Sequence, residues 1–463
     1  MRSLAGRHAT AIAVVSIALI YVWFWSVAAH RIDGHPWVGF AGVFTTNCGD
    51  FEHFYYGALA LRQGTDLYGS GVNGYIYPPL IAFLFAPLTF VPVKTAAFLM
   101  LFVNLGLGLA CTWIASREAV RRFGIDPSAR SIVLVMAVTS ILVATKLRIE
   151  FQMWQTNILL LFALVLALRE LEARPWLAGM LLGAAVNIKY LPIVFLPYLL
   201  IRRRFTAAVW CVVGIVFFAM LPAALSGWDT NLSNLAIALA GVARLVGIET
   251  VKAGANVDPI TAGYSLSITS GIARLLAHYA TRDTVMQIAL VTSAGLLQVF
   301  NAVYRSRGLS VFAGARALVQ TVERSHAVAM LEWSALMAFA LAFSPQTNAR
   351  HLSLLLLVFA PMAAMLVFPR AELRRWPLFV ALAILFLGTN LPPTMPQFAE
   401  QVAWWRNTGA EGWCIALSLP FFLIAGFDYA MAQASSAFAQ HAPSGRARQS
   451  SSTTPSCSPA ARG

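Results

Sequence analysis

Charged residues are scarce in this sequence. Asp, Glu, Lys and Arg make up 11% of the 463 residues, whereas hydrophobic residues make up 59%. Soluble domains carry roughly 25% charged residues, so the deficit excludes a soluble globular protein. Apolar runs of membrane-spanning length recur along most of the chain. The composition therefore predicts an all-α polytopic membrane protein.

Acidic residues are the scarcer of the two charged classes. The chain has 33 Lys and Arg against 19 Asp and Glu, which gives a formal net charge of +14. Such an excess can indicate nucleic-acid binding, but no nucleic-acid-binding motif accompanies it. The basic residues cluster instead in short connections between apolar runs, which is the positive-inside pattern. We therefore expect membrane lipids as partners and no nucleic acid.

Metal-ligand patterns are also missing. No CxxC or other metal spacing occurs among the five cysteines, Cys48, Cys111, Cys211, Cys414 and Cys457. No convincing ligand spacing occurs among the acids expected on the outer face, Asp50, Glu52, Asp66, Asp229, Glu249 and Asp258. We predict that the protein holds no metal and no cofactor. Cys48 and Cys414 could both face outward, so a disulfide between them stays open.

Hydropathy and the placement of Lys and Arg predict about 12 transmembrane helices in one domain, residues 1–432. The predicted spans are 9–29, 94–116, 131–146, 158–170, 175–188, 190–201, 206–225, 284–304, 326–343, 352–368, 376–391 and 412–431. This assignment puts 21 Lys and Arg inside and 12 outside, so both termini are expected to be cytoplasmic. The first span is too long for a signal-peptide core. The Ser/Pro/Ala/Arg-rich tail, 433–463, is predicted to be disordered.

A polar, aromatic stretch at 44–80 separates the first span from the others. From Asp50 onward, the apolar side chains repeat at helical spacing on one face: Phe51, Phe54, Tyr55, Ala58 and Leu59. Asp50, His53 and Gly57 share the other face. The pattern predicts an interfacial helix whose acidic side faces a watery cavity. Further interfacial segments are expected near 80–91 and 231–246.

Asp50 is the candidate catalytic base of this helix. A base that removes a proton from a hydroxyl is well served by a carboxylate on a rigid element. The alternative is a helix cap, which contributes about 1 kcal/mol. Glu52 points away from Asp50 and is the second candidate for the base. His53 shares the face of Asp50, and a structural hydrogen bond is its simpler interpretation.

Two further motifs supply candidate substrate-binding groups. Tyr77 belongs to an aromatic, proline-stiffened turn that suits either an interfacial aromatic belt or a wall beside a sugar or prenyl chain. Gln155 could hydrogen-bond a sugar hydroxyl. Asn157, at the start of an apolar span, could act in the same way or cap the helix. The sequence leaves both pairs of alternatives open.

Lys189 is the most informative single residue. It lies between two predicted spans of only about 12–14 residues, which suggests that it sits below the lipid headgroups. Ionisable groups at membrane depth are costly and usually functional. Although a lysine at a span end can extend to the headgroups, apolar neighbours favour a polar cavity and an anionic partner such as a lipid phosphate.

The run from Ser344 to His351 places further cations at the start of a span. Arg350 and His351 lie where a helix N-terminus offers free N–H groups and the positive end of its dipole, which suits a phosphate. Anchoring at the interface is the alternative. Asn348, in the same run, is a candidate substrate contact. Together with Lys189, these cations predict a site for an anionic head group beside Asp50.

These residues resemble a known family. Asp50-Phe51 with Phe54-Tyr55-Tyr56, then Gly64-x-x-Leu67-Tyr68 and Tyr77-Pro78-Pro79-Leu80, resemble the first outer loop of glycosyltransferase family 87. Gln155-x-Asn157, Gly179-x3-Gly183-x5-Lys189-x-x-Pro192 and Ser344-Pro345 with His351 extend the resemblance over residues 10–430. The family belongs to the GT-C superfamily of multi-span enzymes. Its members include a mannosyltransferase of phosphatidylinositol mannoside synthesis and a mycobacterial arabinofuranosyltransferase.

The resemblance implies an enzyme of a bacterial inner (plasma) membrane. It would move a sugar, with mannose favoured, from a polyprenyl-phosphate donor to a lipid or glycan acceptor on the outer face. Asp50 matches the family's catalytic aspartate, and His351 matches the histidine that holds the donor phosphate. Relatives often carry a Trp/His-rich late motif, so Arg350 could share that contact here. A transporter or lipid flippase is the alternative function.

Overall fold

The computed structural model describes residues 2–33, 50–71, 74–245, 259–310, 322–390 and 396–441, and this part of the chain is helical without strands. The first half contains α1 (Arg2–Asp33), α2 (Phe51–Gln63), α3 (Pro79–Phe85), the 3-10 helix η1 (Ala86–Phe90), α4 (Val93–Arg122), α5 (Ala129–Gln152), α6 (Asn157–Glu170), α7 (Pro175–Ile188), η2 (Leu191–Val194), α8 (Phe195–Ile201), α9 (Phe205–Met220), α10 (Ala223–Ser226) and α11 (Trp228–Leu245). The second half contains α12 (Ile268–Leu275), α13 (Arg282–Ser306), α14 (Val322–Phe343), η3 (His351–Leu355), α15 (Leu356–Val367), α16 (Trp376–Thr389), η4 (Pro396–Phe398), α17 (Ala399–Asn407) and α18 (Ala410–His441).

These elements confirm the prediction of an all-α polytopic membrane protein. Each of the twelve predicted spans coincides with a helix or a 3-10/α pair, and α2, α3–η1 and α11 match the predicted interfacial segments. Seven of the described helices are long and apolar enough to cross a membrane: α1, α4, α5, α9 with α10, α13, α14 and α18. Helix α18 continues past the predicted boundary at 433. Residues 442–463 lie outside the described residues, as do Cys48, Glu249 and Asp258.

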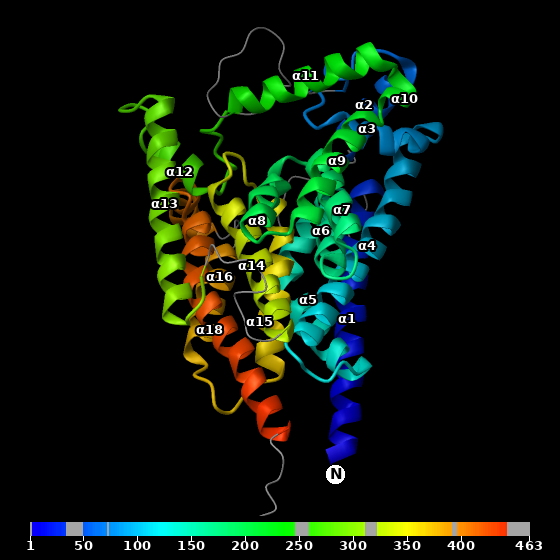
Figure 1. The fold of residues 1–463 in the computed structure, drawn as a ribbon. Coiled ribbons are helices and arrows are strands. Elements are labelled where there is room, and N and C mark those ends of the chain that lie inside the picture. Colours follow the sequence, from blue (N-terminus) through cyan, green and yellow to red (C-terminus); the bar gives the residue numbers. More distant parts are fainter. Residues whose placement is uncertain are drawn as a thin grey trace, which may run out of the picture.

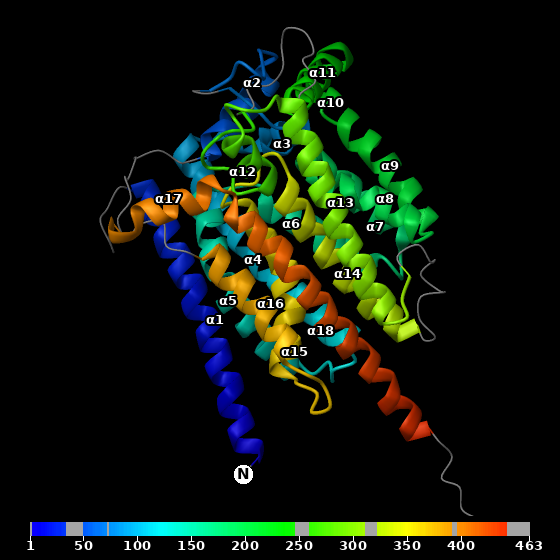
Figure 2. The ribbon, with the colours of Figure 1, turned by 90° about the vertical axis from the view of Figure 1, so that its left-hand side faces the viewer.

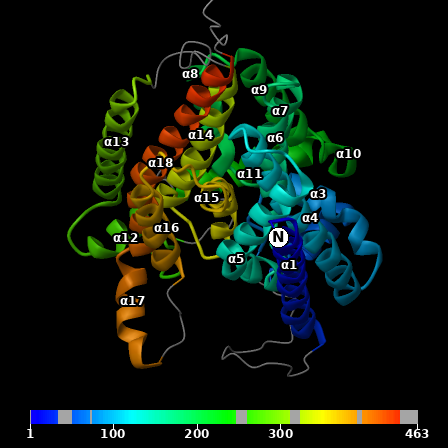
Figure 3. The ribbon, with the colours of Figure 1, turned by 90° about the horizontal axis from the view of Figure 1, so that it is seen from below.

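The long helices form an upright bundle, and α2, α10 and α11 gather at one of its ends (Figures 1 and 2). The N-terminus of α1 lies at the opposite end. Seen along the bundle, α15 lies centrally while α1 and α13 lie at the periphery (Figure 3). Burial supports this arrangement. Every residue of α15 from Leu356 to Met365 is buried, whereas only 17% of the residues in the apolar stretch of α1, and the same share in α13, are buried.

Several candidate residues lie next to the ends of short helices. Helices α6, α7 and α16 each have 14 residues. At 1.5 Å per residue such a helix is about 21 Å long, whereas the hydrocarbon core of a bilayer is about 30 Å thick. Helix α6 begins at Asn157, α7 ends at Ile188 and η3 begins at His351. The candidate residues Asn157, Lys189 and His351 lie at or next to these helix ends.

Two glycines let α7 pack directly on the backbone of α9. A Cβ atom added to Gly183 would lie 2.5 Å from backbone atoms of Gly214 and Ile215, and one added to Gly179 would lie 2.4 Å from the carbonyl of Ala207. Small residues at such positions allow close helix approach in membranes. The Asn187 side chain, one turn farther on, donates to the carbonyl of Ile215 at 3.0 Å. This contact fixes the end of α7, and with it Lys189.

We expect the substitution Gly183→Ala to destabilise the protein by about 1–3 kcal/mol, because neither backbone can move away freely. It should also weaken the function of Lys189, which α7 positions. Thermal unfolding followed by tryptophan fluorescence measures the first effect. Gly106→Ala in α4 is the matched control, because no atom lies within 4 Å of its added Cβ. A melting temperature for Gly183→Ala as high as that of the control would contradict the close packing.

Buried ion pairs hold the bundle together toward the end opposite to α2. Arg122 of α4 donates to Glu118 at 3.0 Å and to the carbonyl of Leu168 in α6 at 2.6 Å. Arg202 pairs with Glu332 of α14, which also accepts the hydroxyl of Tyr304 at 2.8 Å. Each carboxylate is satisfied by its partners, so these pairs connect helices rather than form a reactive site.

Candidate active site

Asp50 immediately precedes α2, but its carboxylate does not cap the helix. Its Oδ2 atom instead accepts hydrogen bonds from the side chain of Gln155 and from the guanidinium of Arg350. The Asp50 side chain is 18% exposed. The cap interpretation of Asp50 is therefore wrong, and the carboxylate joins residues that lie 105 and 300 positions farther along the chain.

Aromatic packing explains why α2 holds Asp50 in this place. The ring of Tyr75 is fully buried, and its hydroxyl donates to the carbonyl of Pro78 at 2.9 Å and accepts the N–H of Ala82 at 3.1 Å. A Cβ atom added to Gly57 would lie 2.5 Å from this ring. Gly57 was expected on the cavity-facing side of the helix. That expectation is wrong, because the glycine is where α2 packs on Tyr75.

Tyr77 forms one side of the site. Its ring packs on Phe54 of α2, with 4.8 Å between ring centroids, and the Lys189 ammonium lies 5.3 Å from its centroid. The latter distance falls within the range of a cation–π interaction. Burial raises the pKa of Tyr77, and the nearby Gln155 side chain opposes that shift. Tyr77 therefore contacts the site, while the neighbouring Tyr75 is a packing residue.

Lys189 follows α7 as its C-cap residue, in extended backbone conformation. Its ammonium donates to Asn157 Oδ1 at 2.6 Å and lies 3.5 Å from Gln155 Oε1 and 3.0 Å from His351 Nε2. Burial lowers the pKa of Lys189 to about 8, and the Glu150 carboxylate opposes that shift. The ammonium therefore turns toward polar partners inside the protein and does not extend to the headgroups.

Glu150 is a residue that the sequence analysis missed. It is fully buried in α5, and its two carboxylate oxygens accept Asn157 Nδ2–H and the backbone N–H of Ile158, each at 2.9 Å. The expectation that Asn157 caps α6 is therefore wrong: the cap residue is Thr156, and the carboxylate of Glu150 takes the free N–H. The predicted span ended at 146, so Glu150 fell in an expected loop, where an acid carries no signal.

The segment before η3 brings in Arg350 and His351. The Asn348 side-chain oxygen accepts the backbone N–H of Arg350 at 3.1 Å, and the Asn348 backbone N–H donates to His351 Nδ1, also at 3.1 Å. Helix α12, which no pattern predicted, holds the segment in place. Hydroxyls of Thr269 and Ser270 donate to the carbonyls of residues 343 and 345, each at 2.7 Å. Asn348 thus orders this turn.

These contacts connect six of the ten candidate residues into one polar network: Asp50, Gln155, Asn157, Lys189, Arg350 and His351. Tyr77 and Asn348 border the network. Glu52 and His53 follow Asp50 in the first turn of α2 and are half-buried. The hydrogen bonds that build the network do not require them. Within the described ranges, no cluster of three or more His, Cys, Asp or Glu residues forms a metal site.

The polar network contains a pair of donors that face each other. His351 Nδ1 accepts a backbone N–H, so in the neutral imidazole the proton is on Nε2. This N–H faces the Lys189 ammonium at 3.0 Å. Both groups can donate, and neither satisfies the other. An anionic oxygen beside the pair could accept from both, and charge-assisted hydrogen bonds to phosphate are among the strongest in proteins.

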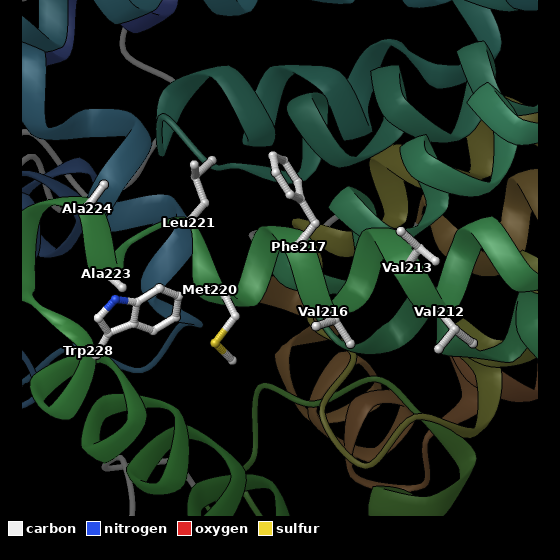
Figure 4. A pocket seen from close by; sticks show the side chains of 9 residues that line it. All are labelled: Val212, Val213, Val216, Phe217, Met220, Leu221, Ala223, Ala224 and Trp228. Carbon is white, nitrogen blue, oxygen red and sulfur yellow. The ribbon is translucent and has the colours of Figure 1, made fainter.

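A separate apolar groove lies along α9 and α10. It has a volume of about 710 Å³ and is lined by Val212, Val213, Val216, Phe217, Met220, Leu221, Ala223, Ala224 and Trp228. Figure 4 shows these side chains along α9, α10 and the first residue of α11. The groove shares no residue with the polar network and offers no group for acid–base chemistry. Its lining suits a hydrocarbon chain.

Comparison with known proteins relates the chain to one family. The family model described as "Glycosyltransferase family 87" matches residues 75–345, which is more than half of the chain. The matched region contains Tyr77, Gln155, Asn157 and Lys189 and ends before Asn348. Asp50 and His351 lie outside it.

Individual relatives are sugar transferases, and the names of two of them state a donor and an acceptor. A "polyprenol-phosphate-mannose-dependent alpha-(1-2)-phosphatidylinositol pentamannoside mannosyltransferase" of Mycolicibacterium smegmatis is 28% identical over 293 residues, which cover 63% of this chain and 64% of the relative. Its namesake from Mycobacterium tuberculosis is 26% identical over 292 residues, with 63% and 61% covered. An "alpha-(1->3)-arabinofuranosyltransferase" of M. tuberculosis is 30% identical over 202 residues, with 39% and 43% covered. The chain thus spans less than two thirds of the length of these relatives.

Proposed function

This chain belongs to glycosyltransferase family 87, and we propose that it transfers a sugar, with mannose favoured, from a polyprenyl-phosphate donor to a lipid or glycan acceptor. In this proposal the reaction takes place on the outer face of a bacterial inner membrane. The names of the relatives support the donor class, since two of them depend on polyprenol-phosphate-mannose. The same names favour mannose as the transferred sugar.

The observation that carries the proposal is that one carboxylate, two cationic side chains and one imidazole meet around the side chain of Gln155. The amide of Gln155 donates to Asp50 and its oxygen lies 3.5 Å from Lys189. His351 and Arg350 complete the group. A transferase of this class needs a base for the acceptor and positive charge for the departing phosphate, held at fixed separation. The polar network supplies both.

The proposed reaction is a single displacement with inversion. The acceptor hydroxyl oxygen bonds to the anomeric carbon while the bond from that carbon to the phosphate oxygen breaks. Asp50 takes the hydroxyl proton, and the bonding electron pair leaves with the polyprenyl phosphate. The phosphate gains negative charge as it departs, so Lys189, Arg350 and His351 stabilise the transition state more than the bound donor.

Arg350 pairs with Asp50 in the structure, and this pair affects the base. A carboxylate that accepts from a guanidinium and an amide is a weaker proton acceptor. When a donor phosphate binds, Arg350 gains a second anion to contact. Its guanidinium can then move toward the phosphate and leave Asp50 free to accept the acceptor proton. Donor binding would thereby precede activation of the base.

The test is an in vitro transfer assay. Purified protein in lipid nanodiscs is incubated with radiolabelled polyprenyl-phosphate sugars and a phosphatidylinositol mannoside acceptor, and products are separated by chromatography. Labelled acceptor is the expected result. If polyprenyl-phosphate sugar instead crosses proteoliposome membranes without transfer, the protein is a flippase and the proposal is wrong. Lipid and glycan profiling of a deletion strain identifies the native sugar.

We expect a chelator to leave this transfer unchanged. The proposed reaction uses protein cations at the phosphate, and it assigns no step to a divalent metal. The measurement compares initial rates with and without EDTA, with magnesium added back as the control. A loss of activity that magnesium restores would require a metal at the phosphate and a new role for the acids of the outer face.

A further inference from the structure

We propose that Glu150 is a positioning residue: through Asn157, its buried carboxylate holds the Lys189 ammonium in place and charged for the donor phosphate. This role rests on the proposed function. The hydrogen bonds of Glu150 go to Asn157 and to the backbone of Ile158, and none goes to Lys189, Arg350 or His351. It therefore acts on the phosphate only through the residues it orients.

The contacts form a chain of three side chains from three elements. Glu150 of α5 accepts Asn157 Nδ2–H at 2.9 Å, and Asn157 at the start of α6 accepts the Lys189 ammonium on its Oδ1 at 2.6 Å. The second oxygen of Glu150 accepts the backbone N–H of Ile158 at 2.9 Å. Both oxygens accept hydrogen bonds, which favours the charged form of Glu150 against the effect of its burial.

The carboxylate and the ammonium together fix the direction of the Asn157 amide. An amide has a donor end and an acceptor end of the same shape, so it can turn either way in a symmetric environment. Glu150 accepts only, and the Lys189 ammonium donates only. The amide nitrogen must therefore face Glu150, and the oxygen must face Lys189. Without the charge on Glu150 only the ammonium maintains this preference.

The charge on Glu150 matters because Lys189 is otherwise surrounded by cations and neutral groups. His351 and Arg350 come from the segment before η3 and its first residue, Tyr77 precedes α3, and Tyr190 follows Lys189. Burial and the neighbouring cations both favour a neutral amine. Glu150 is the anion whose attraction counters them, and Asp50 is already paired with Arg350.

The substitution Glu150→Gln tests this role with little change in shape. A glutamine places an N–H where one carboxylate oxygen accepted a hydrogen bond. The clash is relieved when Asn157 turns its own N–H toward Lys189. We expect the Lys189 ammonium to lose its proton at lower pH, by about one unit. The alkaline limit of binding is the pH at which Lys189 loses its proton and phosphate binding weakens. At a pH above the alkaline limits of both the variant and the wild type, the variant should bind polyprenyl monophosphate about tenfold more weakly than the wild type.

The measurement is the dissociation constant of sugar-free polyprenyl monophosphate in nanodiscs, from about pH 6 to about pH 11, a range that brackets the ordinary pKa values of histidine and lysine. Glu150→Asp keeps the negative charge and should leave the alkaline limit near that of the wild type. Glu332→Gln is the matched control. It removes a buried carboxylate at a distance from the polar network, so it should lower the melting temperature and leave the limit unchanged.

The outcomes separate this role from the proposed function. A shifted limit in Glu150→Gln, with rescue by Glu150→Asp, supports the positioning role. Loss of melting temperature with an unchanged limit shows that Glu150 only stabilises the fold, and it overturns the role while leaving the proposed function intact. If wild-type protein does not bind polyprenyl monophosphate, the proposed function fails, and the role of Glu150 fails with it.

Discussion

Replacing Asp50 with asparagine is expected to lower the transfer rate by at least about 100-fold, because general-base catalysis typically contributes 10²- to 10⁴-fold. Asparagine has nearly the same shape, and its oxygen can still accept from Gln155 and Arg350. Its amide cannot accept the proton of the acceptor hydroxyl. We therefore expect the variant to fold and bind donor like the wild type, with a loss confined to kcat.

The measurements are steady-state kinetics in the transfer assay and a thermal melt. Glu52→Gln is the matched control, since it removes the neighbouring acid of the same helix turn and should retain most of the activity. If Asp50→Asn keeps a rate near that of the wild type while Glu52→Gln loses it, the base is Glu52. Equal retention in both variants would place the base on another element.

The ends of the apolar runs explain why much of the candidate site could be predicted from the sequence. Lys189 and His351 are ionisable residues at the boundaries of apolar runs, where the cost of burial makes an ionisable group informative. The predicted spans on either side of Lys189 are short, so their lengths also predicted that Lys189 lies below the lipid headgroups. Asp50 followed from the alternation of apolar and polar faces along α2. In each case a local pattern carried the prediction.

The parts that failed depend on contacts between distant segments. Glu150 lies inside α5, whose helix continues six residues beyond the predicted span end at 146. Only a fold that buries this turn marks Glu150 as unusual. Gly57 was assigned to the wrong face because a helical wheel cannot show that Tyr75 packs there. Helix α12 has only eight residues, too few for a membrane span, so hydropathy gave no sign of it.

Replacing Lys189 with methionine is expected to raise the donor KM by roughly 10- to 100-fold, since hydrogen bonds to charged groups contribute about 1.5–3 kcal/mol. Methionine fills a similar volume and carries no charge. The loss should be larger for the donor than for the acceptor, because the ammonium faces the phosphate. Transfer kinetics at varied donor concentration measure the effect. An unchanged donor KM would leave the phosphate to Arg350 and His351.

The same substitution should also destabilise the fold, and this second effect tests the pairing inside the polar network. Without the ammonium, Glu150 is a buried anion with two hydrogen bonds but no nearby cation, which costs about 3 kcal/mol. Adding Glu150→Gln removes the unpaired charge, so the double variant should recover most of the lost stability while its donor KM stays high. Thermal melts of the two single variants and the double variant give the coupling energy. If the two losses simply add, Glu150 and Lys189 do not interact, and the phosphate site is built without the carboxylate behind it.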